Sequence, residues 1–263
     1  MNNENSRNAF SQRHNHQSVV PITIRDEAPK LFREFLHNTM RHYLGRHEYH
    51  NDGSEFVFVS IGKVPRNSWR AARNEILNLP WYKVYDLLEN FNEKVQGKST
   101  EQAGHLRMLV NRFFDENGYA YKLSPNGRVE YRGEESFESS LRIANQVLAE
   151  SSLLTARDEI HKAIEDLSRR PKPDLSGAVQ HAMAGLECAA KKVTDEPSLE
   201  LGKVLKKHPT LFPPPLDEVL SKLYGFASNN GRHLVEGGEP TLPEAELIVG
   251  IAAASATYLA RKN

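Results

Sequence analysis

The chain has 263 residues, enough for two helical domains that each bury a core. Lys plus Arg and Asp plus Glu both total 34, so no overall basic field favours nucleic acid, and any RNA contact must be local. The single cysteine, Cys188, excludes an internal disulfide and fits a reducing compartment. The N-terminus is polar, and the most apolar run, residues 247–259, is too short to span a bilayer. We expect a soluble cytoplasmic protein without membrane association.

Apolar residues at spacings of three and four predict several helices in the first half of the chain. Two shorter runs, residues 19–24 and 56–61, are apolar and rich in β-branched side chains, which favours short strands or, for the second run, a buried loop. Asn117-Gly118 supplies a left-handed stop after the last of these helices. The predicted helices cover residues 28–44, 69–79, 81–95 and 101–116.

A β-hairpin is predicted where the first half of the chain gives way to the second. Residues 119–123 and 128–131 alternate in polarity on either side of Ser124-Pro125-Asn126-Gly127. We place a domain boundary near residue 132. The expected fold class is mainly α, with a small helical domain and a β-hairpin over residues 1–132 and a helical bundle over residues 133–263.

The second half is predicted to be almost wholly helical. Residues 134–150 and 152–170 form either two helices or one long, bent helix. Thr241 and Glu244 have capping-box spacing at the start of the last helix, whose small residues from Gly250 to Ala256 suit a central helix or a dimer seam. We expect this helix, over residues 242–260, to be buried among helices 176–193 and 216–228. The remaining predicted helices cover residues 176–193, 201–205 and 216–228.

The segment Leu223–His233 carries the clearest chemical signal. Asn229, Asn230, Arg232 and His233 are expected in the loop after helix 216–228. Arg can hold a phosphate through two parallel hydrogen bonds, and His can move a proton near neutral pH. The alternative is that these polar groups only cap the end of the helix, since Asn and Gly commonly terminate helices.

Glu187 lies at the edge of the apolar stripe of helix 176–193. It is a candidate to orient His233 or to pair with Arg232. The alternative role is a structural ion pair between a helix and a loop.

No metal or cofactor is expected. His37, His42, His47 and His50 are mostly five residues apart, a step that rotates successive helical side chains by about 140° and keeps them off one face. The chain has no P-loop, no Gly-rich dinucleotide motif after a strand and no zinc-type Cys/His spacing. No nucleophile-elbow motif supports a Ser-His-acid triad.

The first half resembles the N-terminal domain of AbiJ-like abortive-infection proteins over roughly residues 9–140. The resemblance rests on Phe10-Ser11-Gln12-Arg13, on Ile22-Thr23-Ile24-Arg25-Asp26-Glu27, on Leu31-Phe32-Arg33-Glu34-Phe35-Leu36 and on Ala120-Tyr121-Lys122-Leu123. It implies a role in bacterial defence against phage.

The second half is similar to helical domains of the HEPN superfamily. The similarity rests on Ala178–Val193 with Glu187, on Leu201-Gly202-Lys203, on Leu223-Tyr224-Gly225, on Gly231-Arg232-His233 and on Glu244-Ala245-Glu246-Leu247. It implies a four- or five-helix bundle, often a dimeric, metal-independent ribonuclease. The superfamily's nuclease motif separates its Arg from its His by several residues, whereas Arg232 and His233 are adjacent and Asn229 stands at a position where the motif's Arg would be acceptable.

Three functional hypotheses follow. The first is a dimeric RNA-cleaving effector in which the 2′-hydroxyl attacks its own phosphodiester, His233 moves the proton, Arg232 stabilises the charge, and Asn229 or Asn230 orients the phosphate. The second is a binding module that senses a nucleotide, RNA or protein without cleaving it. The third is a structural dimer whose N-terminal domain recruits another defence-system protein.

Overall fold

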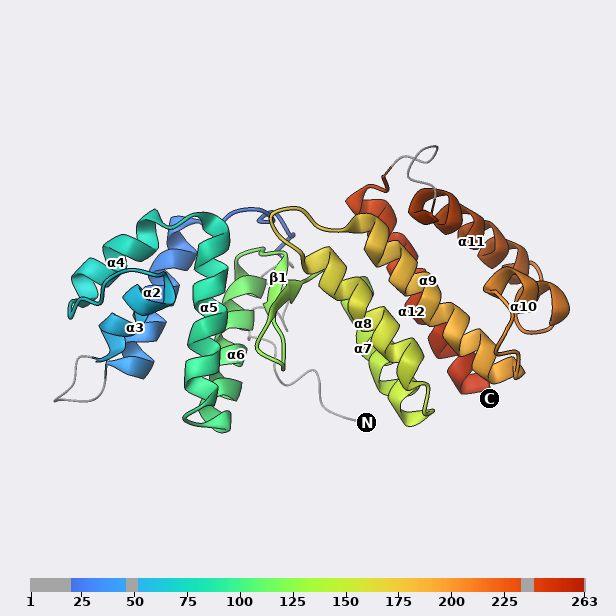
Figure 1. Ribbon diagram of the computed structural model, residues 1–263, viewed down its shortest axis with the longest axis horizontal. Coiled ribbons are helices and arrows are strands. Elements are labelled where there is room, and N and C mark those ends of the chain that lie inside the picture. Colours follow the sequence, from blue (N-terminus) through green and yellow to red (C-terminus); the bar gives the residue numbers. More distant parts are fainter. Residues whose placement is uncertain (1–19, 46–51, 233–238, 263) are drawn as a thin grey trace. The chain divides into compact units, whose positions relative to one another are not determined.

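The chain divides into two compact units, Met1–Val129 and Glu130–Asn263. The computed structural model describes residues 20–45, 52–232 and 239–262 (Figure 1). Helices dominate both units and one two-stranded antiparallel hairpin joins them, which confirms the mainly α fold class. The predicted domain limits, 1–132 and 133–263, stay a prediction. The motif at residues 10–13 and the residues His47, His50 and His233 lie outside the described part of the chain.

The first unit packs five described helices around an aromatic core. The Phe32 ring is fully buried, and its centroid lies 5.2 Å from that of Tyr85, 5.1 Å from that of Phe114 and 5.7 Å from that of Tyr119. Such pairs add to the free energy gained by burying apolar area. The elements are α2 (Lys30–Leu44), α3 (Asp52–Ser60), α4 (Trp69–Asn78), α5 (Trp81–Gln96), α6 (Thr100–Glu116) and β1 (Tyr121–Leu123). Strand β2 (Val129–Tyr131) begins at the last residue of this unit and continues into the second.

Gly118 turns the chain from α6 toward the hairpin, as predicted. Its φ is +69°, and a Cβ there would lie 2.5 Å from the Pro21 carbonyl oxygen. The Gly118 carbonyl accepts the N–H groups of Thr23 and Ile24, at 2.9 and 3.0 Å. Only glycine tolerates both the left-handed conformation and this close approach.

The prediction of a short strand or buried loop at residues 56–61 is wrong, and the β-compatible run at 19–24 forms no regular strand in its described part. Residues 56–61 lie largely in helix α3, where Gly53, Ser54, Val57 and Phe58 are buried at the four-residue period of a helix. A short apolar run cannot be assigned by periodicity alone, so tertiary packing decides its structure. In the described part of residues 19–24 the only pairing is an isolated parallel bridge between Ile24 and Tyr119.

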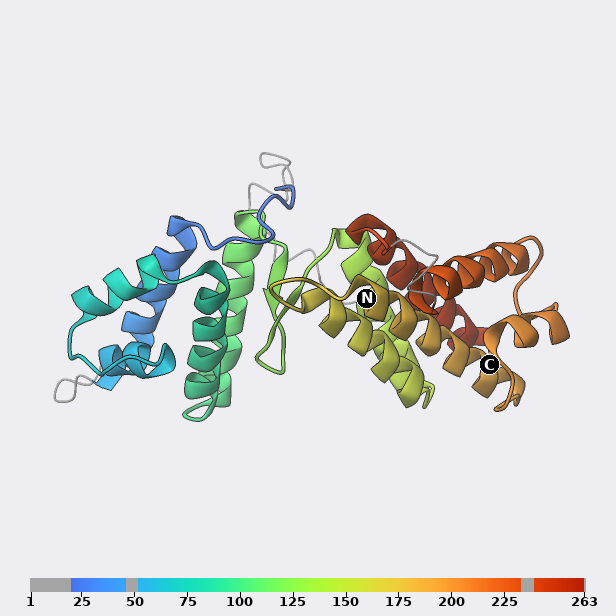
Figure 2. The ribbon, with the colours of Figure 1, turned by 45° about the horizontal axis from the view of Figure 1, so that its top comes forward.

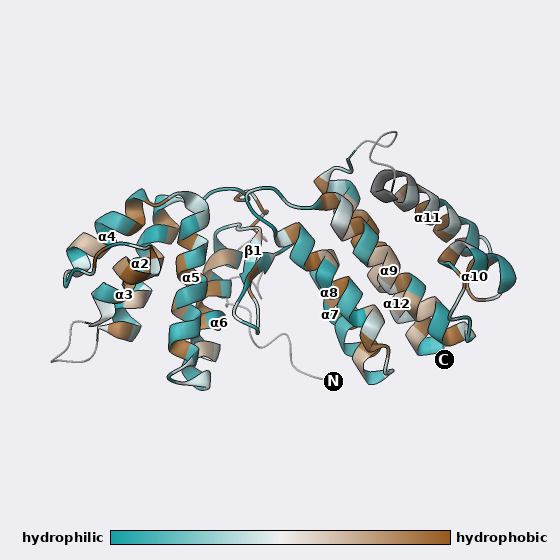
Figure 3. Ribbon diagram, viewed as in Figure 1, coloured by the Kyte–Doolittle hydropathy of each residue, from teal (hydrophilic) through white to brown (hydrophobic). Residues whose placement is uncertain are grey.

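The second unit is a bundle in which α7, α8, α9 and α12 lie side by side, with α10 and α11 beside α9 (Figures 1 and 2). In Figure 3, hydrophilic and hydrophobic residues alternate along α8, as expected for a helix with one buried face. Residues 134–170 form two helices rather than one. The elements are α7 (Glu135–Glu150), α8 (Leu154–Ser168), α9 (Leu175–Thr194), α10 (Leu201–Lys207), α11 (Leu216–Arg232) and α12 (Leu242–Lys262).

Helix α12 is buried as predicted, but its partners differ from the prediction. Ile248 and Ala252 are buried and Ile251 is half-buried, against α9 and α7 rather than mainly against α9 and α11. Glu244 accepts a hydrogen bond from the Thr241 N–H at 2.7 Å, as in a capping box. By length and composition α12 could cross a membrane, and half of its apolar window is buried inside the unit.

Candidate functional site

A cavity of about 270 Å³ opens between α8, α9 and α11. Its lining combines an imidazole, two carboxylates, a phenol and a hydroxyl with a few apolar side chains. The volume lies just below the roughly 300–1,000 Å³ of pockets that hold a whole drug-sized ligand, so the cavity suits one part of a longer chain. The lining residues are Glu159 from α8, Gln180, His181, Met183, Ala184 and Glu187 from α9, and Tyr224, Ala227 and Ser228 from α11.

His181 stands between two carboxylates of α8. Its Nδ1 lies 2.7 Å from Glu159 Oε2, within hydrogen-bonding distance. Its Nε2 lies 3.7 Å from Asp166 Oδ2, too far for a hydrogen bond. The side chain is 36% exposed. A carboxylate on one ring nitrogen fixes the tautomer and orientation of an imidazole, an arrangement that leaves the other nitrogen available to exchange protons.

Glu159 is held as an anion by the groups around it. Burial opposes its ionisation, but hydrogen bonds from Lys162 and His181 outweigh burial and lower the pKa of the carboxyl. Lys162 Nζ lies 2.6 Å from Glu159 Oε1. Each oxygen of Glu159 therefore has its own partner, and the lysine compensates the negative charge at the cavity wall.

Asp166, a buried residue near the end of α8, helps to fix the position of His181. Its side chain is 3% exposed and its Oδ1 lies 2.7 Å from a nitrogen of Arg169. Burial raises the pKa of this carboxyl. The Asp166 carbonyl accepts the Asp174 N–H at 3.0 Å, and the Asp174 carboxylate accepts the Gly177 N–H at 2.7 Å as the N-cap of α9. These bonds fix the start of α9, and hence His181, relative to the end of α8.

Glu187 lines the same cavity, but its described partners are not those considered from the sequence. Its Oε2 accepts the Leu201 N–H at 2.9 Å, at the start of α10, and its Oε1 lies 2.7 Å from Lys191 Nζ. Both oxygens are thus engaged: the first bond holds α10 against α9, and the second is an ion pair within α9. Its predicted pairing with Arg232 or His233 stays a prediction.

Helix α11 continues to Arg232, so the prediction that Asn229, Asn230 and Arg232 lie in a loop is wrong. Asn and Gly are tolerated inside helices at a cost of up to about 1 kcal/mol each, and no proline stops this one. In helical register Arg232 follows Ser228 by one turn, whereas positions 229 and 230 lie about 100° and 200° around the helix from Ser228. The assignment of Asn229, Arg232 and His233 as catalytic and of Asn230 and Glu187 as binding residues stays a prediction.

Sequence reasoning missed His181 and Glu159. They are 22 positions apart in sequence and on different helices, so only the packing of α8 on α9 brings them together. One signal was present: Gln180, His181, Ala184 and Glu187 recur at helical spacing on a face of α9 beside its apolar stripe.

A second cavity, of about 490 Å³, lies where α8 begins and α9 ends. It contains the thiol of Cys188, whose pKa is raised by burial. A raised pKa keeps the thiol protonated and weakly nucleophilic, so this cavity offers less chemistry than the first. Within the described ranges no group of three or more His, Cys, Asp or Glu side chains is arranged to hold a metal ion.

Comparison with known families gives one match. The family model described as AbiJ N-terminal domain 4 matches residues 8–146, more than half of the chain. The chain belongs to the AbiJ N-terminal domain 4 family. No curated protein and no solved structure matches it.

The AbiJ family match covers the first unit and ends within α7. It supports an abortive-infection, anti-phage role for the protein. The residues that line the cavity between α8, α9 and α11 all lie beyond the matched region.

Proposed function

We propose that the protein is a cytoplasmic abortive-infection effector whose C-terminal unit, a HEPN-like bundle, cleaves RNA without a metal ion. The observation that carries the proposal is the imidazole of His181, held by Glu159 at 2.7 Å and facing a cavity whose third wall is α11. An oriented imidazole can take up a proton at neutral pH without any metal. One turn beyond the wall residue Ser228, α11 carries Arg232, a residue type suited to bind a phosphate.

Charge at the cavity wall is compatible with an anionic substrate. The two carboxylates, Glu159 and Glu187, would repel a phosphate if they were bare. Lys162 lies 2.6 Å from the first and Lys191 lies 2.7 Å from the second. Each of the two carboxylate charges is therefore compensated by a lysine. One further cation contributed by α11 would make the net charge near the cavity positive.

Non-catalytic binding of a nucleotide or RNA is the alternative function. The observation that favours it is the phenol ring of Tyr224 in the cavity wall, because an aromatic face can stack on a base without any proton transfer. The adjacency of Arg232 and His233 also departs from the nuclease motif of HEPN domains.

An assay with purified full-length protein separates these functions. We expect cleavage of single-stranded RNA in the presence of EDTA, with products that end in a 2′,3′-cyclic phosphate, and no cleavage of the DNA of the same sequence because it lacks the 2′-hydroxyl. RNA binding without cleavage would favour the alternative. Cleavage that needs a divalent cation or that proceeds equally on DNA would contradict the proposed mechanism.

Homodimerisation through the C-terminal unit is part of the proposal. Of the six small residues of α12 expected at a dimer seam, Ala252, Ala253 and Ala256 are buried within the unit, whereas Ala254 is exposed. An apolar stripe of α11 remains exposed or half-exposed: Leu216, Val219, Leu223 and Phe226. Their spacing of three, four and three residues is that of a coiled-coil seam, which a second copy of the same helix can complete.

A further inference from the structure

We propose that His181 is the proton-transfer residue of the cavity between α8, α9 and α11, acting on the 2′-hydroxyl of a ribonucleotide, with Glu159 as its positioning residue. The inference deepens the proposed RNA-cleaving function and rests on it. It assigns the reactive imidazole to His181 of α9 instead of His233.

The geometry around the ring supports this role. Glu159 Oε2 accepts the Nδ1 hydrogen at 2.7 Å, which places the basic lone pair of neutral His181 on Nε2. Nε2 is 3.7 Å from Asp166 Oδ2 and makes no hydrogen bond with it. Nε2, the nitrogen that must reach the substrate, is therefore hydrogen-bonded to neither Glu159 nor Asp166.

The cavity places the His181 imidazole of α9 next to residues of α11. His181 lines the same cavity as Tyr224 and Ser228, and Arg232 lies one turn beyond Ser228 on α11.

The reaction balances without a metal or a co-reactant. The 2′-oxygen attacks the phosphorus and forms a P–O bond while its proton passes to His181 Nε2. The bond between phosphorus and the 5′-oxygen breaks, and the leaving oxygen takes a proton from water. The products are a 2′,3′-cyclic phosphate and a 5′-hydroxyl end. Glu159 stabilises the imidazolium that forms, as a carboxylate does beside a catalytic histidine.

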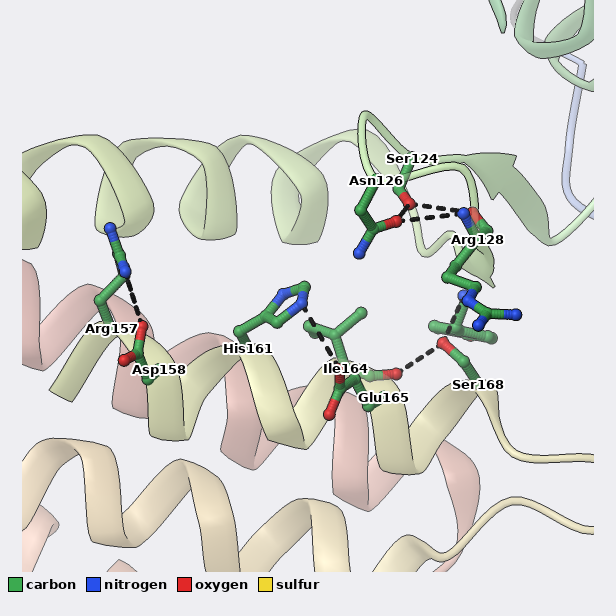
Figure 4. A network of polar contacts seen from close by, with 10 residues as sticks. Ser124, Asn126, Arg128, Arg157, Asp158, His161, Ile164, Glu165 and Ser168 are labelled. Carbon is green, nitrogen blue, oxygen red and sulfur yellow. Dashed lines mark hydrogen bonds and ion pairs between the residues drawn. The ribbon is translucent and has the colours of Figure 1, made fainter. Parts of the chain in front are cut away.

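His161 provides a matched control. It lies on α8 in the same unit, and its Nε2 faces the Glu165 carboxylate at 3.7 Å (Figure 4). It is 48% exposed and lines neither of the two described cavities. Replacing it removes an imidazole next to a carboxylate but leaves the cavity intact.

The test compares RNA cleavage by the wild type and by the variants His181→Ala and His161→Ala. We expect His181→Ala to lose on the order of 100-fold or more in kcat, the usual cost of removing a general base. We expect His161→Ala to keep wild-type activity. Free imidazole added to His181→Ala should restore part of the rate, which a merely structural histidine would not allow.

A second variant tests the positioning role. Glu159→Gln should lower kcat while leaving KM for the RNA nearly unchanged, because the amide cannot stabilise the imidazolium but keeps the side-chain size. Wild-type cleavage that survives in a well-folded His181→Ala variant would overturn the inference and leave the proposed function standing. Absence of cleavage by the wild type itself would overturn the proposed function and the inference together.

Discussion

At the scale of single residues, two carboxyl groups of α8 next to His181, those of Glu159 and Asp166, differ in how their pKa values are shifted. The pKa of Glu159 is lowered because hydrogen bonds from Lys162 and His181 outweigh the effect of burial. The pKa of Asp166 is raised because burial dominates. The pKa values of two carboxyl groups on one helix are thus shifted in opposite directions.

The lowered pKa of Glu159 predicts a pH-dependent contribution to stability. A carboxyl whose pKa is lower in the folded than in the unfolded chain stabilises the fold above its unfolded pKa, about 4.3 for Glu, and loses that contribution as the pH falls through the folded pKa. We expect Glu159→Gln to lower the free energy of unfolding at neutral pH and to have a smaller effect at acidic pH. Urea denaturation at both pH values measures this, and an effect that grows on acidification would contradict it.

Arg232→Ala tests whether the arginine is needed for activity. His233→Ala distinguishes His181 from His233 as the residue that moves the proton. Loss of a cation that stabilises transition-state charge typically costs about 100-fold or more in rate, so Arg232→Ala should abolish cleavage or toxicity while the melting temperature stays unchanged. If His181 moves the proton, His233→Ala keeps most of the activity. An inactive, well-folded His233→Ala variant would instead favour the assignment made from the sequence. A collapsed melting temperature in either variant would point to a role in ending the helix.

At the scale of secondary-structure elements, α8 and α9 pack closely against each other in the second unit. Gly185 makes this approach possible: a Cβ there would lie 2.8 Å from Ile160 Cγ1 and 2.9 Å from the Ala156 carbonyl oxygen. The second atom belongs to the backbone and cannot move by a change of rotamer. The same contact between the two helices brings Glu159 next to His181, so packing and candidate chemistry depend on one surface.

Gly185→Ala should therefore destabilise the protein. The added methyl group forces the helices apart, at a cost of about 1–3 kcal/mol that exceeds the gain in helix propensity of up to about 1 kcal/mol. Gly225→Ala in α11 is the matched control, because nothing lies within 4 Å of a Cβ there and only the propensity gain remains. Thermal melting of the two variants should give shifts of opposite sign. A stabilised Gly185→Ala variant would show that α8 and α9 can separate freely.

The helices with long apolar stripes could be predicted from the sequence because their buried residues recur at the helical period. The hairpin and the stop at Gly118 could also be predicted, since local backbone chemistry determines them. Residues 56–61 were misassigned because a short apolar run has no distinguishing period, and the end of α11 because Asn and Gly are compatible with both helix and cap. The pairing of His181 with Glu159 could not be predicted, because it depends on how two helices pack.

At the scale of the whole molecule, the functional role of the first unit is supported by a family match and that of the second unit by its cavities and side chains. The family match covers the first unit and supports the abortive-infection role. The second unit holds both described cavities and the candidate chemistry, but the match ends within its first helix. A defence protein that acts through its second unit must keep that unit inactive or harmless in uninfected cells. Assembly is one physical means of controlling the change between an inactive and an active state, because binding a second copy shifts the equilibrium toward the state that binds it.

The last prediction concerns that assembly. Leu216 and Val219 are each 52% exposed on α11, and α11 packs within the unit mainly against α9 and α10. We expect a homodimer in light scattering at micromolar concentration, and we expect Val219→Glu to yield a monomer because a charge in an apolar seam would be buried without a partner. Glu218→Gln, next to it on an exposed face, is the control and should stay dimeric. A specific dimer buries at least about 1,000 Å² in total, more than one short seam provides, so neighbouring surfaces of the unit must contribute. A wild type that stays monomeric, or a Val219→Glu variant that stays dimeric, would remove this face from the assembly.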